Sequence, residues 1–195
     1  MPLMNIKLNK LTQKEKGYLF GVFKGDGYIF HDKKGRQYLV DFYLNSIKDR
    51  DIIKSLNVIL KKIETNPYNY KDKRYNCMRI RVRSKLFYNF IKTQKIQNNK
   101  DFILGFVSGL IDSDGYVNFK KSFIQIVNTD KELLINTHIL LKMLNIRSTL
   151  RNKTPSRKDK KKAFNLFITF KFIDTNNNSL KIRRGFIKKY SRMEQ

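Results

Sequence analysis

Two aspartates, Asp26 and Asp114, occupy equivalent places in this sequence, 88 positions apart (114 − 26). Each follows an apolar stretch punctuated by small residues and precedes a glycine, in GYLFGVFKGDGYI at 17–29 and GFVSGLIDSDGYV at 105–117. Two carboxylates brought together can bind a hard divalent cation such as Mg²⁺, which keeps several of its waters. Because the aspartate recurs in two equivalent contexts, we favour such a site over the alternative that each Asp-Gly is only a turn before a strand.

The stretches before the two aspartates predict a pair of helices in close contact. Their apolar blocks are too short to span a bilayer. Small residues recur at every fourth position of each stretch: Gly17, Gly21 and Gly25 in one, Gly105, Gly109 and Ser113 in the other. A glycine inside a helix costs about 0.8 to 1.0 kcal/mol relative to alanine, and close approach of two backbones offsets that cost. We therefore expect the two helices to pack together about a pseudo-two-fold axis.

The predicted helix ends explain why a cation is needed. Gly27 and Gly115 stand where a left-handed residue often closes a helix. The aspartates then lie at helix C-termini, where the macrodipole already places about half a negative charge. A bound Mg²⁺ (or Mn²⁺) would compensate for the charge of both carboxylates.

The segments that follow the two Asp-Gly pairs repeat one order of elements. In the first half, the predicted strands are 28–30, 37–45 and a pair within 66–83, and the predicted helices are 52–63 and 86–91. In the second half, the predicted strands are 116–120, 123–128, 147–153 and 163–172, and the predicted helices are 133–144 and 179–190. The sequence therefore predicts an α+β fold of two pseudo-symmetric αββαββα halves, at 1–95 and 101–195, joined by a short linker at 96–100.

The charge of the chain predicts a polyanionic partner. A net charge of +26, from 42 Lys and Arg against 16 Asp and Glu, would be self-repulsive without one. We expect nucleic acid rather than a membrane surface, because no single basic amphipathic helix is present. The lone Cys77 and the absence of an apolar signal segment predict an intracellular protein, in the cytoplasm or an organelle matrix.

Basic residues alternate with apolar ones along several predicted strands. In MRIRVR at 78–83, the alternation places three arginines on one face, which suits contacts to guanine in the major groove. The alternative is an ordinary solvated sheet face. The run SRKDKKK at 156–162 is a candidate phosphate-contacting loop or a solvated hairpin tip. The candidate DNA-binding residues are Arg79, Arg81, Arg83, Arg147, Arg151, Lys153 and Lys171.

The segments at 19–27 (LFGVFKGDG) and 107–115 (VSGLIDSDG) resemble the two motifs of a single-chain LAGLIDADG homing endonuclease, the second more closely than the first. The resemblance implies a monomer whose two antiparallel sheets form a DNA-binding saddle. It also implies that Asp26 and Asp114 bind Mg²⁺ (or Mn²⁺) together, with the carbonyls of Gly25 and Ser113 as further ligands. Each half would cut one strand of double-stranded DNA across the minor groove of a long pseudo-palindromic site.

The family also tends to place a polar residue and a lysine after the second strand of each half. Aligning NSIKD at 45–49 with NTDKE at 128–132 gives Lys48 and Lys131 as catalytic candidates, the alternative being solvated lysines. The preceding residue is Ile47 in the first half, and Lys24 stands where the motif usually has an acid.

These departures leave the competence of the first half open between slow cutting of one strand, nicking, and binding without cleavage. An RNA maturase that assists intron splicing and a non-catalytic DNA-binding protein are the alternatives to an endonuclease. The Met1 start fits an intron-encoded or free-standing gene better than an intein.

Overall fold

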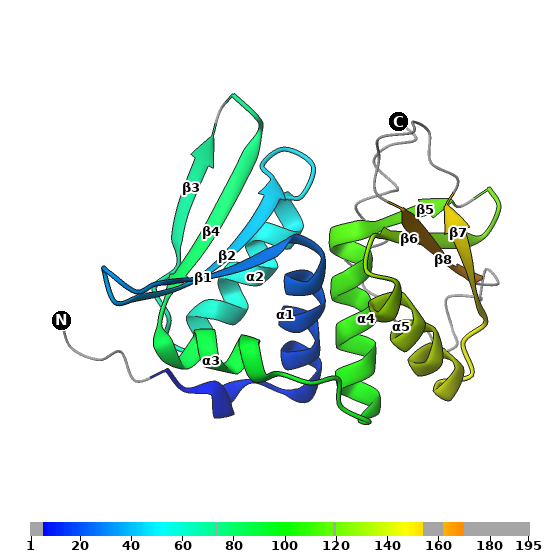
Figure 1. The fold of residues 1–195 in the computed structure, drawn as a ribbon, viewed down its shortest axis with the longest axis horizontal. Helices are drawn as coiled ribbons and strands as arrows, with labels where there is room; N and C mark the ends of the chain where they lie inside the picture. Colours follow the sequence, from blue (N-terminus) through cyan, green and yellow to red (C-terminus); the bar gives the residue numbers. More distant parts are fainter. Residues whose placement is uncertain (1–5, 73, 119, 154–161, 170–195) are drawn as a thin grey trace.

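The computed structural model describes residues 6–72, 74–118, 120–153 and 162–169, and consists of two similar halves. Each half has a four-stranded antiparallel sheet with helices on one face, and helices α1 and α4 stand side by side where the halves meet (Figure 1). The first half contains a 3-10 turn at Leu8–Lys10, then α1 (Gln13–Asp26), β1 (Gly27–Asp32), β2 (Gln37–Asn45), α2 (Arg50–Lys62), β3 (Tyr68–Asp72), β4 (Cys77–Arg83) and α3 (Lys85–Thr93). The second half contains α4 (Lys100–Asp114), β5 (Gly115–Asn118), β6 (Phe123–Asn128), α5 (Lys131–Met143), β7 (Ser148–Lys153) and β8 (Ala163–Thr169).

Polar side chains at the N-termini determine where the two central helices begin. At α1, the backbone N–H of Glu15 donates to the Thr12 hydroxyl and the Thr12 N–H donates to the Glu15 carboxylate, which is a reciprocal capping box. At α4, the side chain of Asn99 accepts a hydrogen bond from the N–H of Phe102. Both helices therefore start from a defined residue, which sets the position of the aspartates one helix length away.

The sheets have the same topology, in the orders β1-β2-β4-β3 and β5-β6-β8-β7. Alternate residues of the central strands point towards the helices. Val40 and Phe42 of β2 and Ile80 of β4 are fully buried in the first half, as are Ile126 of β6 and Leu166 of β8 in the second. No helix among the described residues covers the opposite face of either sheet, which is called the uncovered face below.

The structure confirms the predicted fold of two αββ-containing halves built on antiparallel sheets. The predicted strands 37–45 and 123–128 match β2 and β6, and the arginine alternation places Ile80 and Val82 in the core. The predicted helix 179–190 and the last residues of the strand predicted at 163–172 lie outside the described residues. In the part of the chain that is described, no helix has the length and apolar character needed to cross a membrane.

The prediction that a left-handed glycine closes each motif helix is wrong. Gly27 has φ −97° and ψ 154°, and Gly115 has φ −90° and ψ 143°, which is extended backbone. The chain passes directly from helix into strand, so the residue after the aspartate lies against the last helical turn. A Cβ at Gly27 would overlap the carbonyl oxygen of Phe23, and one at Gly115 would overlap that of Ile111. Glycine is needed there for space and not for its access to positive φ.

Candidate metal centre and nucleic-acid interface

Helices α1 and α4 touch backbone to backbone along their glycine stripes. A Cβ added at Gly17 would overlap the carbonyl oxygen of Phe102, and one added at Gly105 would overlap that of Lys14. These two contacts are reciprocal, because Gly17 and Lys14 correspond to Gly105 and Phe102 in the repeat. The helices therefore pack about the pseudo-two-fold axis that the sequence predicts.

The C-terminal ends of the two helices also meet, and this brings the candidate ligands together. A Cβ at Gly25 would overlap the side chain of Ser113 and would lie 3.2 Å from Oδ2 of Asp114. The carboxylate of Asp114 thus lies beside the backbone of α1 at the residue before Asp26. Ser113 donates its hydroxyl hydrogen within its own helix, with the carbonyl oxygen of Gly109 at 3.0 Å and that of Leu110 at 3.1 Å. Its backbone carbonyl lies at the helix end.

Asp114 is held by a residue that sequence reasoning did not single out. Nδ2 of Asn128, the last residue of β6, donates to Oδ2 of Asp114 at 2.7 Å. Burial raises the pKa of the Asp114 carboxyl above its ordinary value, and the hydrogen bond from Asn128 lowers it in part. The ionised carboxylate of Asp114 is therefore costly at this enclosed helix junction, and a cation bound next to it would stabilise it.

Asp26 ends α1 and is half-buried at the same junction. The two carboxylates come from equivalent places in the repeat. Within the described ranges, no group of three or more His, Cys, Asp or Glu could hold a metal ion. A pair of carboxylates with backbone carbonyls is nevertheless the donor set that suits Mg²⁺ or Mn²⁺, since these ions take oxygen ligands and complete their shell with water and substrate phosphate. The residues present therefore fit a divalent cation of this kind.

The residues two positions before the aspartates differ between the halves. Asp112 is buried, with 6% of its surface exposed, and the Tyr18 hydroxyl donates to its Oδ2 at 3.1 Å across the helix interface. Lys24, its counterpart in the first half, is exposed, and its Nζ lies 5.4 Å from the ring centroid of Phe20. The acid of the second motif is thus part of the helix interface, whereas the lysine of the first motif faces solvent.

The candidate catalytic lysines lie at equivalent points after the second strand of each half. Lys48 lies in the turn between β2 and α2, where its backbone N–H donates to Oδ1 of Asn45. Lys131 is the first residue of α5, and its Nζ lies 5.6 Å from the ring centroid of Phe164. Both lysines are exposed, and Ile47 beside Lys48 is 51% exposed.

The three candidate arginines of β4 share the uncovered face of the first sheet but have different environments. Arg83 is exposed, and Arg79 stacks its guanidinium 5.2 Å from the ring centroid of Tyr70. Arg81 makes two hydrogen bonds to the buried carboxylate of Asp41 on β2, at 2.8 and 2.6 Å. This ion pair raises the pKa of Arg81, with the hydrogen bonds to Asp41 as the main cause.

Among the described residues, the uncovered face of the second sheet carries fewer charges than that of the first. Nε2 of Gln125 donates to Oδ1 of Asn165 at 3.1 Å, and the guanidinium of Arg151 lies 5.6 Å from the ring centroid of Phe167. Lys153 is exposed at the end of β7. Arg147 is exposed just before β7 and not within it, and Lys171 and residues 156–161 lie outside the described residues.

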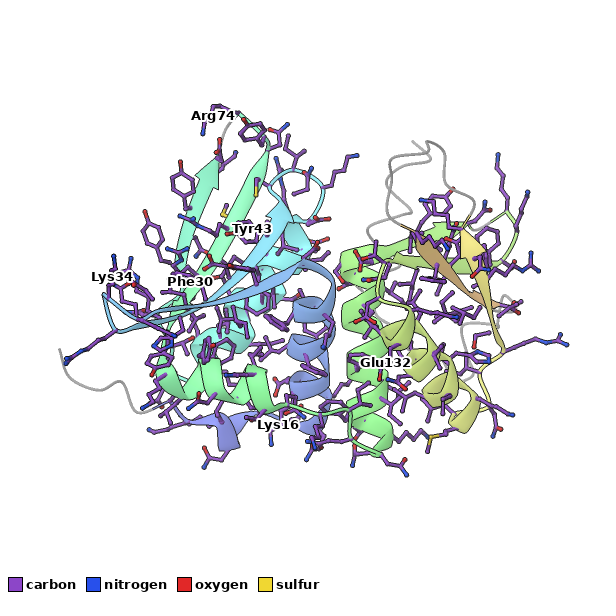
Figure 2. The ribbon with its side chains drawn as sticks, in the orientation of Figure 1. Lys16, Phe30, Lys34, Tyr43, Arg74 and Glu132 are labelled. Atoms are coloured by element: carbon purple, nitrogen blue, oxygen red, sulfur yellow. The ribbon has the colours of Figure 1, made fainter. Side chains whose placement is uncertain are left out.

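Sequence reasoning missed the aromatic side chains on the first sheet. Several are exposed on the face that the helices leave uncovered, including Phe30 and Tyr43, which are labelled in Figure 2. Their exposed fractions are 54% for Tyr28, 46% for Phe30, 41% for Tyr43, 57% for Tyr68 and 43% for Tyr70. The alternation of side chains along the strands could have predicted these exposed rings, because each ring stands at a position that points away from the core. Asp41 and Asn128 were also missed, since their partners are set by tertiary contacts.

Comparison with known proteins identifies the family of this chain. A family model described as a LAGLIDADG-like domain matches residues 13–93 and 101–190. The uncharacterized protein MJ0398 of Methanocaldococcus jannaschii is 32% identical over 142 residues, which cover 70% of this chain and 51% of that protein. A second protein of that organism, MJ0314, is 25% identical over 146 residues, covering 66% of this chain and 53% of the other. The chain therefore spans about half the length of these curated relatives.

Solved structures show the same fold. I-DmoI in complex with DNA and Ca has a TM-score of 0.65 at 20% identity, covering 80% of this chain and 83% of that chain. I-DmoI in complex with DNA and Mn has a TM-score of 0.64 at 21% identity, covering 80% of this chain and 90% of that chain. The N-terminal LAGLIDADG domain of WhiA has a TM-score of 0.58 at 15% identity, covering 100% of this chain and 97% of that chain. At these identities the likeness concerns the fold.

Proposed function

Because this chain belongs to the LAGLIDADG-like domain family, we propose that it is a site-specific DNA endonuclease that makes a staggered double-strand break in a long, imperfectly palindromic site. The observation that carries the proposal is the junction of the two helix ends. There the carboxylate of Asp114 lies 3.2 Å from the Cβ position of Gly25, the residue before Asp26. Two equivalent carboxylates at a pseudo-two-fold axis suit two equivalent cuts, one in each strand.

In this proposal, Asp26 and Asp114 hold Mg²⁺ or Mn²⁺, with the backbone carbonyls of Gly25 and Ser113 as further ligands. Bound there, the cation would activate the attacking water and neutralise charge at the phosphorus and the departing 3′ oxygen. Asn128 orients the carboxylate of Asp114 through its 2.7 Å hydrogen bond. Lys48 and Lys131 offset charge on the scissile phosphates.

The proposed substrate follows from the charge of the chain and from the two uncovered sheet faces. The net charge of +26 supplies the attraction to a polyanion, and lysines meet phosphates while arginine and amide side chains read base edges. The similar structures of I-DmoI with DNA and a divalent metal support a duplex partner and a metal-dependent reaction. Since one chain provides both halves, we propose that it acts as a monomer, inside the cell.

The experiment uses the protein with a randomised duplex library, first in Mg²⁺ and then in Ca²⁺, followed by sequencing of the ends. Asp26→Asn and Asp114→Asn should each abolish double-strand cleavage and leave duplex binding within about twofold of wild type, because each removes one metal-binding charge. Asp101→Asn is the matched control, since Asp101 is an exposed acid in the first turn of α4. If both motif variants cut at the wild-type rate, the assignment is wrong.

One observation favours a second candidate, an RNA maturase. The exposed rings of the first sheet, such as Tyr28 and Tyr68, can stack on unpaired bases, which duplex DNA does not offer. Competition between the duplex library and intron RNA separates the two functions. Tighter RNA binding without metal-dependent cleavage would favour the maturase, and duplex selection without cleavage would indicate a DNA-binding protein.

A further inference from the structure

Four residues stand directly opposite one another across the first sheet, on its uncovered face. The register pairs Tyr28 with Asp41, Asp41 with Arg81, and Arg81 with Tyr68. Asp41 is 2% exposed, although the face around it carries arginines and would meet phosphates. A carboxylate placed there repels a polyanion and is costly to bury, so its presence calls for a role beyond surface charge.

The geometry of the pair indicates what that role is. Nε of Arg81 donates to Oδ1 of Asp41 at 2.8 Å and Nη2 donates to Oδ2 at 2.6 Å, so the carboxylate occupies the side edge of the guanidinium. The hydroxyl of Tyr43 also donates to Oδ2, at 3.2 Å. The plane of the guanidinium is therefore fixed from one side. Nη1 makes no hydrogen bond to any residue that the structure describes, and 21% of the Arg81 side chain is exposed.

We propose that Asp41 is a positioning residue that holds Arg81 to read one guanine in the major groove under the first sheet. The proposal rests on the duplex-binding function proposed above. The end edge of the guanidinium, formed by Nη1 and the second hydrogen of Nη2, matches O6 and N7 of guanine. Because Asp41 fixes the side chain before binding, less conformational freedom is lost when the contact forms.

The second half provides an internal comparison. Its equivalent row is Tyr116, Gln125, Phe167 and Thr149, which keeps a tyrosine at one end but contains neither the acid nor the arginine. The guanine requirement should therefore belong to one half of the target only. Arg83, two residues along β4, is exposed and makes no ion pair with the described part of the chain. No described carboxylate therefore orients its guanidinium.

The test is selection of bound duplexes from the randomised library in Ca²⁺, with wild type, Asp41→Asn, Arg81→Ala and the double variant. Wild type should require guanine at one position of one half-site. Asp41→Asn should lower that preference by roughly tenfold and leave binding to unselected duplex unchanged or tighter, because a negative charge is removed. Arg81→Ala should remove the preference at the same position, and the double variant should lose no more than Arg81→Ala does.

Arg83→Ala is the matched control, and it should lower affinity while keeping the guanine preference at that position. If Asp41→Asn weakens binding to all sequences alike and keeps the preference, Asp41 only stabilises the sheet and the proposal is overturned. Arg81→Lys separates positioning from charge: it keeps the charge, and loss of the preference is expected. If wild type selects no duplex sequence at all, the proposed function itself fails, and this inference fails with it.

Discussion

Replacement of Gly21 by alanine tests the backbone contact between α1 and α4, because the contact decides whether the free energy of unfolding falls or rises. Gly21 lies in the middle of α1, where helix propensity alone favours alanine by about 0.8 to 1.0 kcal/mol. In the structure, an added Cβ would overlap the carbonyl oxygen of Phe106 and would lie 3.0 Å from both Cα of Gly109 and the backbone nitrogen of Leu110. All three obstacles are backbone atoms, so no side-chain rotation can relieve them.

The magnitude follows from these two opposing effects. Overpacking in a tight core typically costs 1 to 3 kcal/mol, and backbone obstacles place Gly21→Ala at about 3. After subtraction of the propensity gain, the free energy of unfolding should fall by about 2 kcal/mol. For a chain of this size, the unfolding temperature should fall by about 4 to 8 °C.

The assay is thermal and urea unfolding followed by circular dichroism, with Gly35→Ala as the control. Gly35 lies in the turn between β1 and β2, where a new Cβ would meet the carboxylate of Asp32, which can rotate away. Gly35→Ala should change the free energy of unfolding by no more than about 0.5 kcal/mol. If Gly21→Ala instead raises the unfolding temperature, the gain in helix propensity meets no opposing backbone overlap, and the close contact of the two helices is refuted.

Three further changes test the polar contacts of the helix pair. Burial raises the pKa of Asp114, so the folded state holds its proton more tightly than the unfolded state does, and stability is lost as the pH rises from the ordinary pKa of an aspartate through the raised one. Asp114→Asn without metal should therefore raise the unfolding temperature at pH 7 and change it less at pH 3. Asn128→Ala removes the donor that lowers this pKa, so without metal the fall in unfolding temperature with rising pH should extend to higher pH than in wild type, as measured by thermal unfolding from pH 3 to 9. Tyr18→Phe removes a donor to the buried Asp112 carboxylate and should lower the free energy of unfolding by about 1 to 3 kcal/mol in urea; an unchanged midpoint would contradict this account of the interface.

Local signals allowed most of the fold to be predicted. Alternation and turn residues predicted β2 and β6 at their observed bounds, because one face of each strand is core and the other is solvent. Repetition of the glycine stripe predicted the helix pair, because only close backbone contact offsets so many glycines in helices. The conformation of Gly27 was not predictable, since Asp-Gly fits both a left-handed cap and a direct passage into a strand.

The candidate site could be predicted only in part. The aspartates were identified because they end repeated elements, but the partner of Asp41 depends on the register between β2 and β4, which α2 and β3 separate in sequence. That register also pairs Arg81 with a carboxylate, which the alternation along β4 cannot reveal. Asn128 was visible as a strand end, but its bond to Asp114 depends on how β6 packs against α4.

The two halves share the backbone contacts of the helix pair, but they differ in the side chains around the two aspartates. Lys24 and Ile47, which depart from the family pattern, are both exposed, so the fold accommodates them without cost to the core. Lys24 also places a positive charge in the last turn of α1, where it offsets the helix dipole near Asp26. The glycine contacts between the helices, by contrast, are reciprocal. A difference in cutting rate between the two DNA strands would therefore arise from the groups around Asp26 and the scissile phosphate, with the helix pair itself intact.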